Sequence, residues 1–186
     1  MSAMPRGFTI IEIGITLLIV GLLMALGLPS FVTWIGNTQI RTGGEAVLNG
    51  IQLARAEAVR RNTTTEFLLT DLADTPPGTG WSVSTISSAG AVVETLQTRS
   101  KKEGSPNAAV VLTPAAATKL TFNGMGRVVA NPDLSVSLTQ IDIANPGAGT
   151  CEAGGGAMRC LQIRIGLGGS VRMCDPKVAA GDPRAC

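Results

Sequence analysis

An apolar run near the start of this 186-residue chain limits what it can fold into more than any other feature. Between Phe8 and Ile40 the only charged side chain is Glu12. A helix needs about 20 predominantly apolar residues to cross a bilayer. A carboxylate at the membrane centre costs roughly 2.5–3.5 kcal/mol, so its presence marks a functional position. The run therefore predicts one membrane helix that carries one functional acid.

Three simpler interpretations of this run fit less well. A cleaved secretory signal has a shorter apolar core, followed by a small-residue cleavage site. A plain membrane anchor has the right length but leaves Glu12 unexplained. A buried core helix of a soluble protein rarely stays uncharged over so long a segment. The residues immediately before and around Glu12 therefore decide between these interpretations.

The segment Arg6–Glu12 reads Arg-Gly-Phe-Thr-Ile-Ile-Glu and resembles the class III leader of type IV pilins and type II secretion pseudopilins. The resemblance implies that a membrane-embedded prepilin peptidase cuts after Gly7 and N-methylates Phe8, the new first residue. It extends to Pro29, at a position where such pilins often carry a proline that kinks the helix. Residues 1–7 are then a leader peptide.

Glu12 is expected to act in assembly and not in catalysis. Cleavage leaves a cationic amine on Phe8, and an opposite charge within about 4–6 Å favours both ionised groups. The resemblance implies that Glu12 meets the Phe8 amine of a neighbouring subunit, since its own helix supplies only a partial dipole charge. Such a buried pair fixes register more than it adds stability. The alternative is a carboxylate that is solvated among lipid headgroups.

The helix is predicted to continue beyond the membrane, from residue 8 to residue 62, with a bend at Pro29. Gly43, Gly44 and Gly50 lower the helix propensity of the second half and predict local looseness there. Seven apolar residues of that half recur at helical spacing. They are Ile40, Val47, Leu48, Ile51, Ala54, Ala58 and Val59.

Charged residues near the end of this helix are expected on its solvated face. They are Arg55, Arg60 and Arg61, and Glu57 lies four residues before Arg61, within reach for an ion pair.

After residue 63 the pattern changes to short strands separated by turns rich in Gly and Pro. The predicted strands are Thr65–Thr70, Trp81–Ile86, Val92–Thr98, Ala109–Leu112, Leu120–Phe122, Arg127–Val129, Leu134–Ile143, Leu161–Leu167 and Ser170–Met173. Alternation predicts one wet face for the strand from Leu134 and points Gln162 and Arg164 outward. Phe122 is expected in the core.

The predicted fold class is therefore α+β, a type IV pilin-like long N-terminal helix packed on an antiparallel β head. We expect a hydrophobic transmembrane or filament-core segment over 8–35, an amphipathic continuation over 36–62 and a globular periplasmic head over 63–186.

Four cysteines, Cys151, Cys160, Cys174 and Cys186, lie close to the C-terminal end. Their spacing lacks the C-x-x-C pairs of a zinc ribbon, and disulfides persist in the periplasm. Four cysteines allow three pairings. We favour Cys151–Cys160 and Cys174–Cys186, because each closes a short local loop and contributes roughly 2–3 kcal/mol. The other two pairings stay open at this point.

Four further segments resemble the GspH/FimT group of minor pilins, and the resemblance covers nearly the whole chain. They are Leu48–Asn62 at the helix end, Thr121–Arg127 in the sheet, and the tail segments Arg172–Pro176 and Asp182–Cys186. The resemblance implies a structural or priming subunit of the inner membrane that joins a type IV pilus. Its partners are then other pilins and the prepilin peptidase. A type II secretion pseudopilin is the alternative.

The residue inventory argues against an enzyme. The chain has no His, which removes the commonest general base and metal ligand. Gly154-Gly155-Gly156 follows no predicted strand and opens no predicted helix, so it does not fit a phosphate-binding loop. We therefore expect no cofactor, no metal and no small-molecule substrate.

DNA binding is a further hypothesis that the resemblance raises. FimT-type minor pilins are associated with DNA uptake through a Gly-Arg-x-Arg motif, and Gly169–Arg172 matches it except that Ser170 replaces the first Arg. The candidate contacts are Arg164, Arg172, Lys177 and Arg184. So few cations predict weak, salt-sensitive binding. Ordinary surface charge is the competing interpretation.

Overall fold

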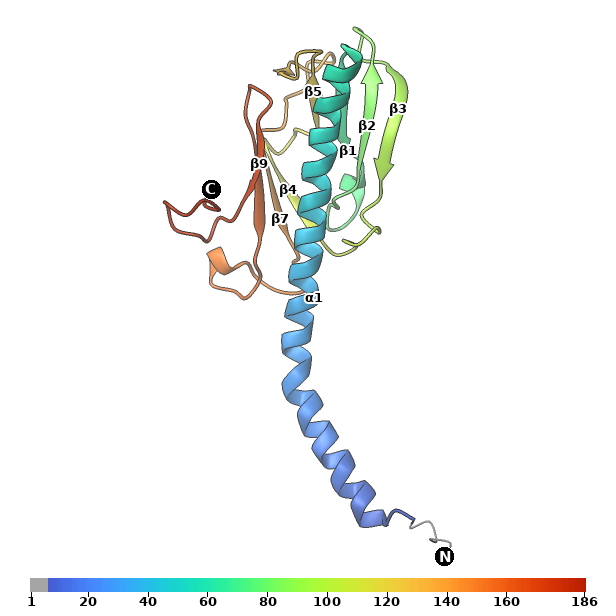
Figure 1. Ribbon diagram of the computed structural model, residues 1–186, viewed down its shortest axis with the longest axis vertical. Coiled ribbons are helices and arrows are strands. Elements are labelled where there is room, and N and C mark those ends of the chain that lie inside the picture. The colour runs from blue at the N-terminus through green and yellow to red at the C-terminus, as the bar shows by residue number, and fades with distance from the viewer. Residues whose placement is uncertain (1–6) are drawn as a thin grey trace, which may run out of the picture.

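The computed structural model describes residues 7–186, in which one long helix carries a β-rich head (Figure 1). Helix α1 spans Ile10–Arg61, and its first half projects well beyond the head. Thr9 caps the start of α1, because its hydroxyl accepts a hydrogen bond from the Glu12 amide at 3.3 Å. The cap places Glu12 in the first turn.

The helix ends where the sequence predicts. Asn62 takes the left-handed conformation with φ 48°, and its amide donates to the Val59 carbonyl. The following amide, of Thr63, donates to the Ala58 carbonyl at 3.1 Å. These bonds satisfy carbonyls that the helix leaves unpaired and turn the chain toward the first strand.

Helix α1 is bent between its two halves. The segments Ile10–Ala25 and Ser30–Arg61 lie at 40° to each other, and residues 26–29 join them. This junction contains Pro29, and a proline inside a helix removes one hydrogen bond of the helical ladder. By length and composition, the bent pair taken together could cross a membrane, whereas no single helix among the described residues passes the same test.

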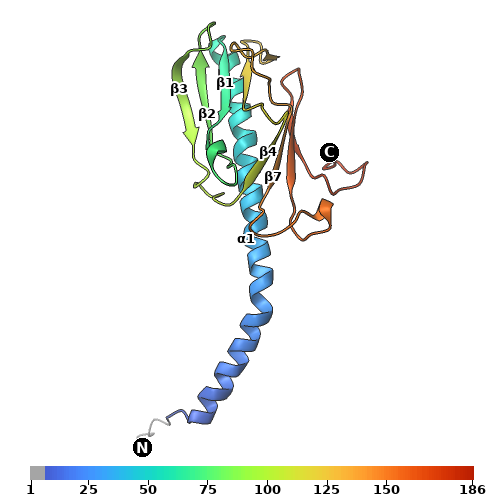
Figure 2. The same ribbon diagram turned by 180° about the vertical axis from the view of Figure 1, so that it is seen from behind.

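The head consists of two antiparallel sheets, and α1 lies across both (Figure 2). The first has the order β3-β2-β1-β5-β6 and the second the order β4-β7-β8-β9. The strands are β1 Thr65–Leu69, β2 Trp81–Ile86, β3 Val92–Arg99, β4 Ala109–Thr113, β5 Lys119–Phe122, β6 Val128–Val129, β7 Gln140–Ala144, β8 Leu161–Ile165 and β9 Val171–Cys174. Two short 3-10 helices, Asp71–Ala73 and Glu152–Gly154, lie between strands. The predicted α+β class is confirmed.

The core lies between α1 and the inner faces of the two sheets. The helix contributes fully buried residues at the predicted helical spacing, and Phe122 is fully buried on β5, as expected. The helical set is Ile40, Val47, Ile51, Ala54 and Ala58. The sequence also predicts Leu48 and Val59 on this stripe. Leu48 is half-buried, whereas Val59 is exposed. The second half of α1 is therefore the central element of the head.

The expectation of looseness at Gly43, Gly44 and Gly50 is wrong. All three glycines are buried on the face of α1 that the sheets contact. A Cβ atom on Gly50 would lie 2.8 Å from the Trp81 ring and 2.9 Å from the Phe67 ring. These glycines let the sheets approach the helix backbone closely, so their low helix propensity is offset by packing.

The predicted strand beginning at Leu134 is also wrong for its first half, since β7 begins only at Gln140. Leu134 adopts φ 61° and is 88% exposed. The cause is local hydrogen bonding, because Asp133 accepts from both the amide and the hydroxyl of Ser135, at 3.1 and 2.7 Å. Asn131 donates to the Ser135 carbonyl at 3.0 Å. Such side-chain bonds offer the backbone an alternative to a sheet ladder.

The remaining strands begin and end within two residues of their predicted bounds.

Replacing Gly50 with Val is expected to destabilise the head. The new side chain collides with Trp81 and Phe67, and overpacking of this kind typically costs about 1–3 kcal/mol. The free energy of unfolding, measured by urea titration of the full chain in detergent, should fall by that amount. Gly21→Val is the matched control, because a Cβ at Gly21 meets nothing within 4 Å. An equal loss in both variants would contradict the close-approach role.

The carboxyl group of Asp133 is expected to make the stability of the folded head depend on pH. The Lys119 ammonium, 2.7 Å from its carboxylate, and the Ser135 hydrogen bonds lower the pKa of Asp133 to about 2. A lowered folded-state pKa means that the stabilisation is present above the unfolded pKa of about 3.9 and is lost as the pH falls toward 2. Asp133→Asn should therefore show a smaller loss of stability between pH 4 and pH 2 than the native chain, measured by urea unfolding. An equal loss in both proteins would refute this.

Candidate functional site

The first half of α1 presents its apolar side chains to the surroundings and not to the head. Exposed large apolar side chains run from Ile10 to Met24 and again from Phe31 to Ile35, on the part of the helix that projects beyond the head (Figure 1). Ile10 is 92% exposed and Trp34 is 63% exposed. Water disfavours exposed apolar area by about 25 cal/mol per Å², so this surface needs lipid or other helices around it.

Glu12 is the one charged side chain on this surface. Its carboxylate has no hydrogen-bond or ion-pair partner anywhere in residues 7–186, although its amide is bonded to Thr9. Phe8, which is 80% exposed, lies just before the helix. Arg6 of the leader motif lies outside the described residues. The geometry leaves the Glu12 carboxylate available to a group from another molecule.

The structure joins the cysteines in the pairs that the loop-length argument favours. Cys151 and Cys160 are bonded with their Cα atoms 5.4 Å apart, and Cys174 and Cys186 with theirs 5.1 Å apart. The first bond closes the loop between β7 and β8, and the second draws the chain end back to the end of β9. Both bonds therefore fix irregular segments to the second sheet.

The four candidate DNA contacts do not form one free basic surface. Arg164 and Arg172 are paired across β8 and β9, and both guanidiniums donate to the Cys186 carbonyl, at 2.7 and 3.2 Å. Arg184 forms an ion pair with Asp182 at 3.0 Å, which lowers the pKa of the Asp182 carboxyl. Lys177 lies in the tail between Cys174 and Cys186. The structure thus brings Arg164 and Arg172 together on the Cys186 carbonyl.

Gln162 was expected on a wet face, and this expectation is wrong. It is 8% exposed, and its amide donates to the Asp142 carboxylate at 2.6 Å on the neighbouring strand. Its carbonyl accepts from Arg164 at 2.7 Å. The face is covered at Gln162, where the disulfide-bonded tail lies against it and Cys174 is also buried, whereas Arg164 on the same face is exposed, as predicted. Alternation alone does not reveal such a covering segment.

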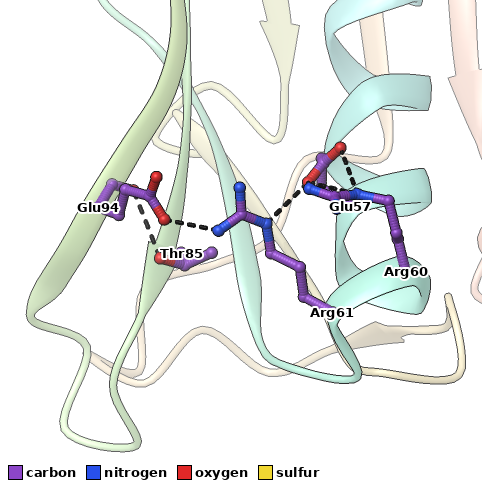
Figure 3. Close-up of polar contacts among 5 residues, drawn as sticks. All are labelled: Glu57, Arg60, Arg61, Thr85 and Glu94. Carbon is purple, nitrogen blue, oxygen red and sulfur yellow. Dashed lines mark hydrogen bonds and ion pairs between the residues drawn. The ribbon is translucent and has the colours of Figure 1, made fainter.

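The end of α1 carries a charged network that sequence reasoning found only in part (Figure 3). Arg61 donates to Glu57 at 2.9 Å, as its spacing predicts, and Arg60 also pairs with Glu57 at 2.6 Å. The hydrogen bond from Arg60 is the main cause of a lowered pKa of the Glu57 carboxyl, and the hydrogen bond from Arg61 lowers this pKa further. Arg61 also reaches Glu94 on β3 at 2.6 Å. No local sequence signal pairs residues so far apart.

Arg55 was expected only to face solvent, but it also makes a contact with the head. Its Nε donates a hydrogen bond at 3.1 Å to the carbonyl of Gly126, which lies in the turn between β5 and β6. Together these contacts attach the end of the helix to the first sheet. No cluster of three or more candidate metal-ligating side chains occurs within the part of the chain that the structure describes.

An exposed apolar half-helix continuous with a half-helix packed on an antiparallel head is the architecture of a type IV pilin-like subunit. A family model described as type II transport protein GspH matches residues 44–169. The chain belongs to this GspH family.

Two crystal structures of the type IV minor pilin FimU of Pseudomonas aeruginosa are similar to this chain. Each shares 22% sequence identity with a TM-score of 0.48 and covers 72% of this chain. The matched parts cover 90% and 87% of the two FimU chains. No curated protein matches this chain.

Removal of the Cys174–Cys186 bond is expected to release the tail. Replacing both cysteines with Ser should lower the free energy of unfolding by roughly 3 kcal/mol, because the bond closes a loop of 12 residues. Limited trypsin digestion should then cut after Lys177 faster than in the native chain. The matched control replaces Cys151 and Cys160, which should leave this cleavage slow. Equal cleavage in the two variants would mean that the bond does not hold the tail.

Proposed function

We propose that this protein is a minor pilin, a structural and priming subunit of type IV pilus assembly. The observation that carries the proposal is the exposed apolar half of α1, in whose first turn the Glu12 carboxylate has no partner from residues 7–186. A surface of this kind is stable in a membrane or among the helices of a filament, and in either place its single carboxylate needs a cationic partner. Membership of the GspH family supports the coarser part of the proposal, a subunit of the pilin-like class.

In this proposal the chain is first inserted in the inner membrane with the head in the periplasm. The prepilin peptidase cuts after Gly7 and N-methylates Phe8. The two disulfides of the head are consistent with an oxidising compartment. Residues 1–7 are the leader, 8–35 the transmembrane and filament-core segment, 36–62 its amphipathic continuation and 63–186 the head.

Assembly then transfers the apolar half-helix from lipid to a bundle of similar helices of other pilins. The Glu12 carboxylate meets the Phe8 amine of the neighbouring subunit, and this pair sets the stagger between the two. An incorrect register leaves both charges unpaired in an apolar setting, which is costly. The bend at Pro29 and the rigid second half of α1 then fix where the head lies relative to the filament axis.

A type II secretion pseudopilin is the second candidate, and the description of the family model favours it. The two candidates share fold, processing and the role of Glu12, so only the host machine separates them. Deletion of the gene, scored in parallel for surface pili, twitching and protein secretion, distinguishes the two. Loss of pili and twitching with normal secretion supports the pilus, and the reverse supports the pseudopilus.

DNA binding is the weaker third candidate. Arg164 and Arg172 lie side by side, but the Cys186 carbonyl accepts hydrogen bonds from both. Arg184 is paired with Asp182. Because the affinity for duplex DNA rests on the number of phosphates contacted, cations already engaged in the tail contribute little. Duplex binding by the full chain that is strong, salt-sensitive and lost on Arg172→Ala would reverse this order.

Replacing Glu12 with Ala is expected to leave processing intact and to reduce incorporation strongly. Removing one partner of a buried ion pair costs about 3–5 kcal/mol, because the other charge is left unpaired. The measurement compares the amounts of mature protein in membranes and in sheared pili or pseudopili. Thr16→Ala is the matched control on the same exposed segment, and Gly7→Leu marks the size of the uncleaved precursor. Normal incorporation of Glu12→Ala would refute the pairing.

A further inference from the structure

A hollow of about 570 Å³ opens on the side of the head nearest the exposed half of α1. One wall is the helix face with Trp34, Asn37 and Arg41, and the other is formed by the chain around Arg159 and by the C-terminal tail with Arg184. The Arg159 amide donates to the Asn37 side chain at 2.7 Å and so ties the two walls together. The hollow thus lies where α1 leaves its apolar segment and enters the head.

The lining of this hollow is cationic. It contains three arginines, Arg41, Arg159 and Arg184, against one acid, Asp175. Arg41 and Arg184 pair with Glu45 and Asp182, neither of which belongs to the lining, and Arg159 is 3.7 Å from Asp175. Arg184 holds Asp182 with two hydrogen bonds and is engaged in the tail, whereas Arg41 bonds Glu45 through Nε alone. Each guanidinium has five N–H donors, so Arg41 and Arg159 keep donors available to a bound anion.

The hollow also has an apolar part, with the exposed Trp34 ring at its membrane end and Leu161 and Met173 in its wall. Trp34 stacks on Phe31 with ring centroids 5.9 Å apart. Tryptophan is enriched at the level of lipid headgroups, where one side of the ring meets acyl chains and the other meets water. The end of the exposed apolar surface, at Ile35, gives an independent indication of the same level.

We infer that this hollow binds the headgroup of an anionic phospholipid while α1 spans the membrane. The inference rests on the membrane insertion in the proposed function. Arg41 lies about 10 Å beyond Trp34 along the helix axis at 1.5 Å per residue. Helical side chains point back toward the N-terminus, which here is the membrane side. Arginine holds phosphate with two parallel hydrogen bonds, a geometry that a planar guanidinium is suited to form.

The occupant is a lipid because one continuous surface offers an apolar part for acyl chains and a cationic part for the phosphate. The Phe31 and Trp34 rings contact the acyl chains next to the glycerol group, and the arginines contact the phosphate. An acidic segment of a partner protein would match the arginines, but it would not need the hollow to lie beside an exposed apolar helix. Headgroup binding would hold the subunit in the bilayer at a fixed depth until assembly extracts it.

The test uses the full chain purified in detergent, with phosphatidylglycerol or phosphatidylcholine added and bound lipid measured by native mass spectrometry. Phosphatidylglycerol should bind more tightly than phosphatidylcholine. Loss of one charge-assisted contact should weaken this binding about tenfold in Arg159→Gln and in Arg41→Gln. Arg127→Gln is the matched control, because it removes the same charge from an exposed turn that does not line the hollow. Intact disulfides and unchanged tryptophan emission confirm that each variant folds.

Four outcomes would overturn the inference. Equal binding of the two lipids would mean that the arginines recognise no anionic headgroup, and an equal loss in Arg127→Gln would mean nonspecific charge attraction. Displacement of the lipid by inorganic phosphate would assign the site to a free anion. Normal lipid binding with poor filament incorporation of Arg159→Gln would assign the hollow to an acidic protein partner. Glu12→Ala should bind lipid normally, so failure of this inference is separable from failure of the assembly proposal.

Discussion

Contact between one face of α1 and the inner faces of both sheets is the interaction on which the head depends. Strands of the two sheets share no ladder, since each strand pairs only within its own sheet. The helix contributes core residues to both, and its buried glycines allow the sheets to pack close to its backbone. A side chain at Gly50 would separate Trp81 and Phe67 from the helix. The two sheets are therefore held as one head chiefly through α1.

The same helix couples this head to its exposed apolar half. No loop separates the two parts, so the direction in which the head points is set by the bend over residues 26–29 and by the contacts of the second half. The Arg61–Glu94 ion pair and the Arg55–Gly126 hydrogen bond attach the far end of α1 to the first sheet. Exposed ion pairs of this kind add little stability. Their geometric effect is to fix the helix against the sheet at its last turns.

Local sequence patterns predicted local structure well, and they failed where distant segments meet. The helix end at Asn62, most strand positions and the short-range cysteine pairs each follow from neighbouring residues. Gly50 and Gln162 were misjudged because their surroundings come from other parts of the chain, a sheet in one case and the tail in the other. Leu134 was misjudged for a different reason. Its alternating pattern competes with an Asp133 turn, and the local hydrogen bonds prevail.

The match to the GspH family and the leader motif are independent, because they concern different residues. The family model covers 44–169, which is the packed part of α1 and most of the head. Glu12, Trp34 and the Cys174–Cys186 bond lie outside this range. Within it, Gly44, Gly50 and the core residues of α1 from Val47 onward explain a fold that joins a helix to two sheets. Outside it lie the Glu12 carboxylate, the Phe31–Trp34 aromatic pair at the end of the apolar surface, and the tail that engages Arg164 and Arg172. In the proposed function, a common head can therefore serve different filaments, while the segments around it set where and with what it assembles.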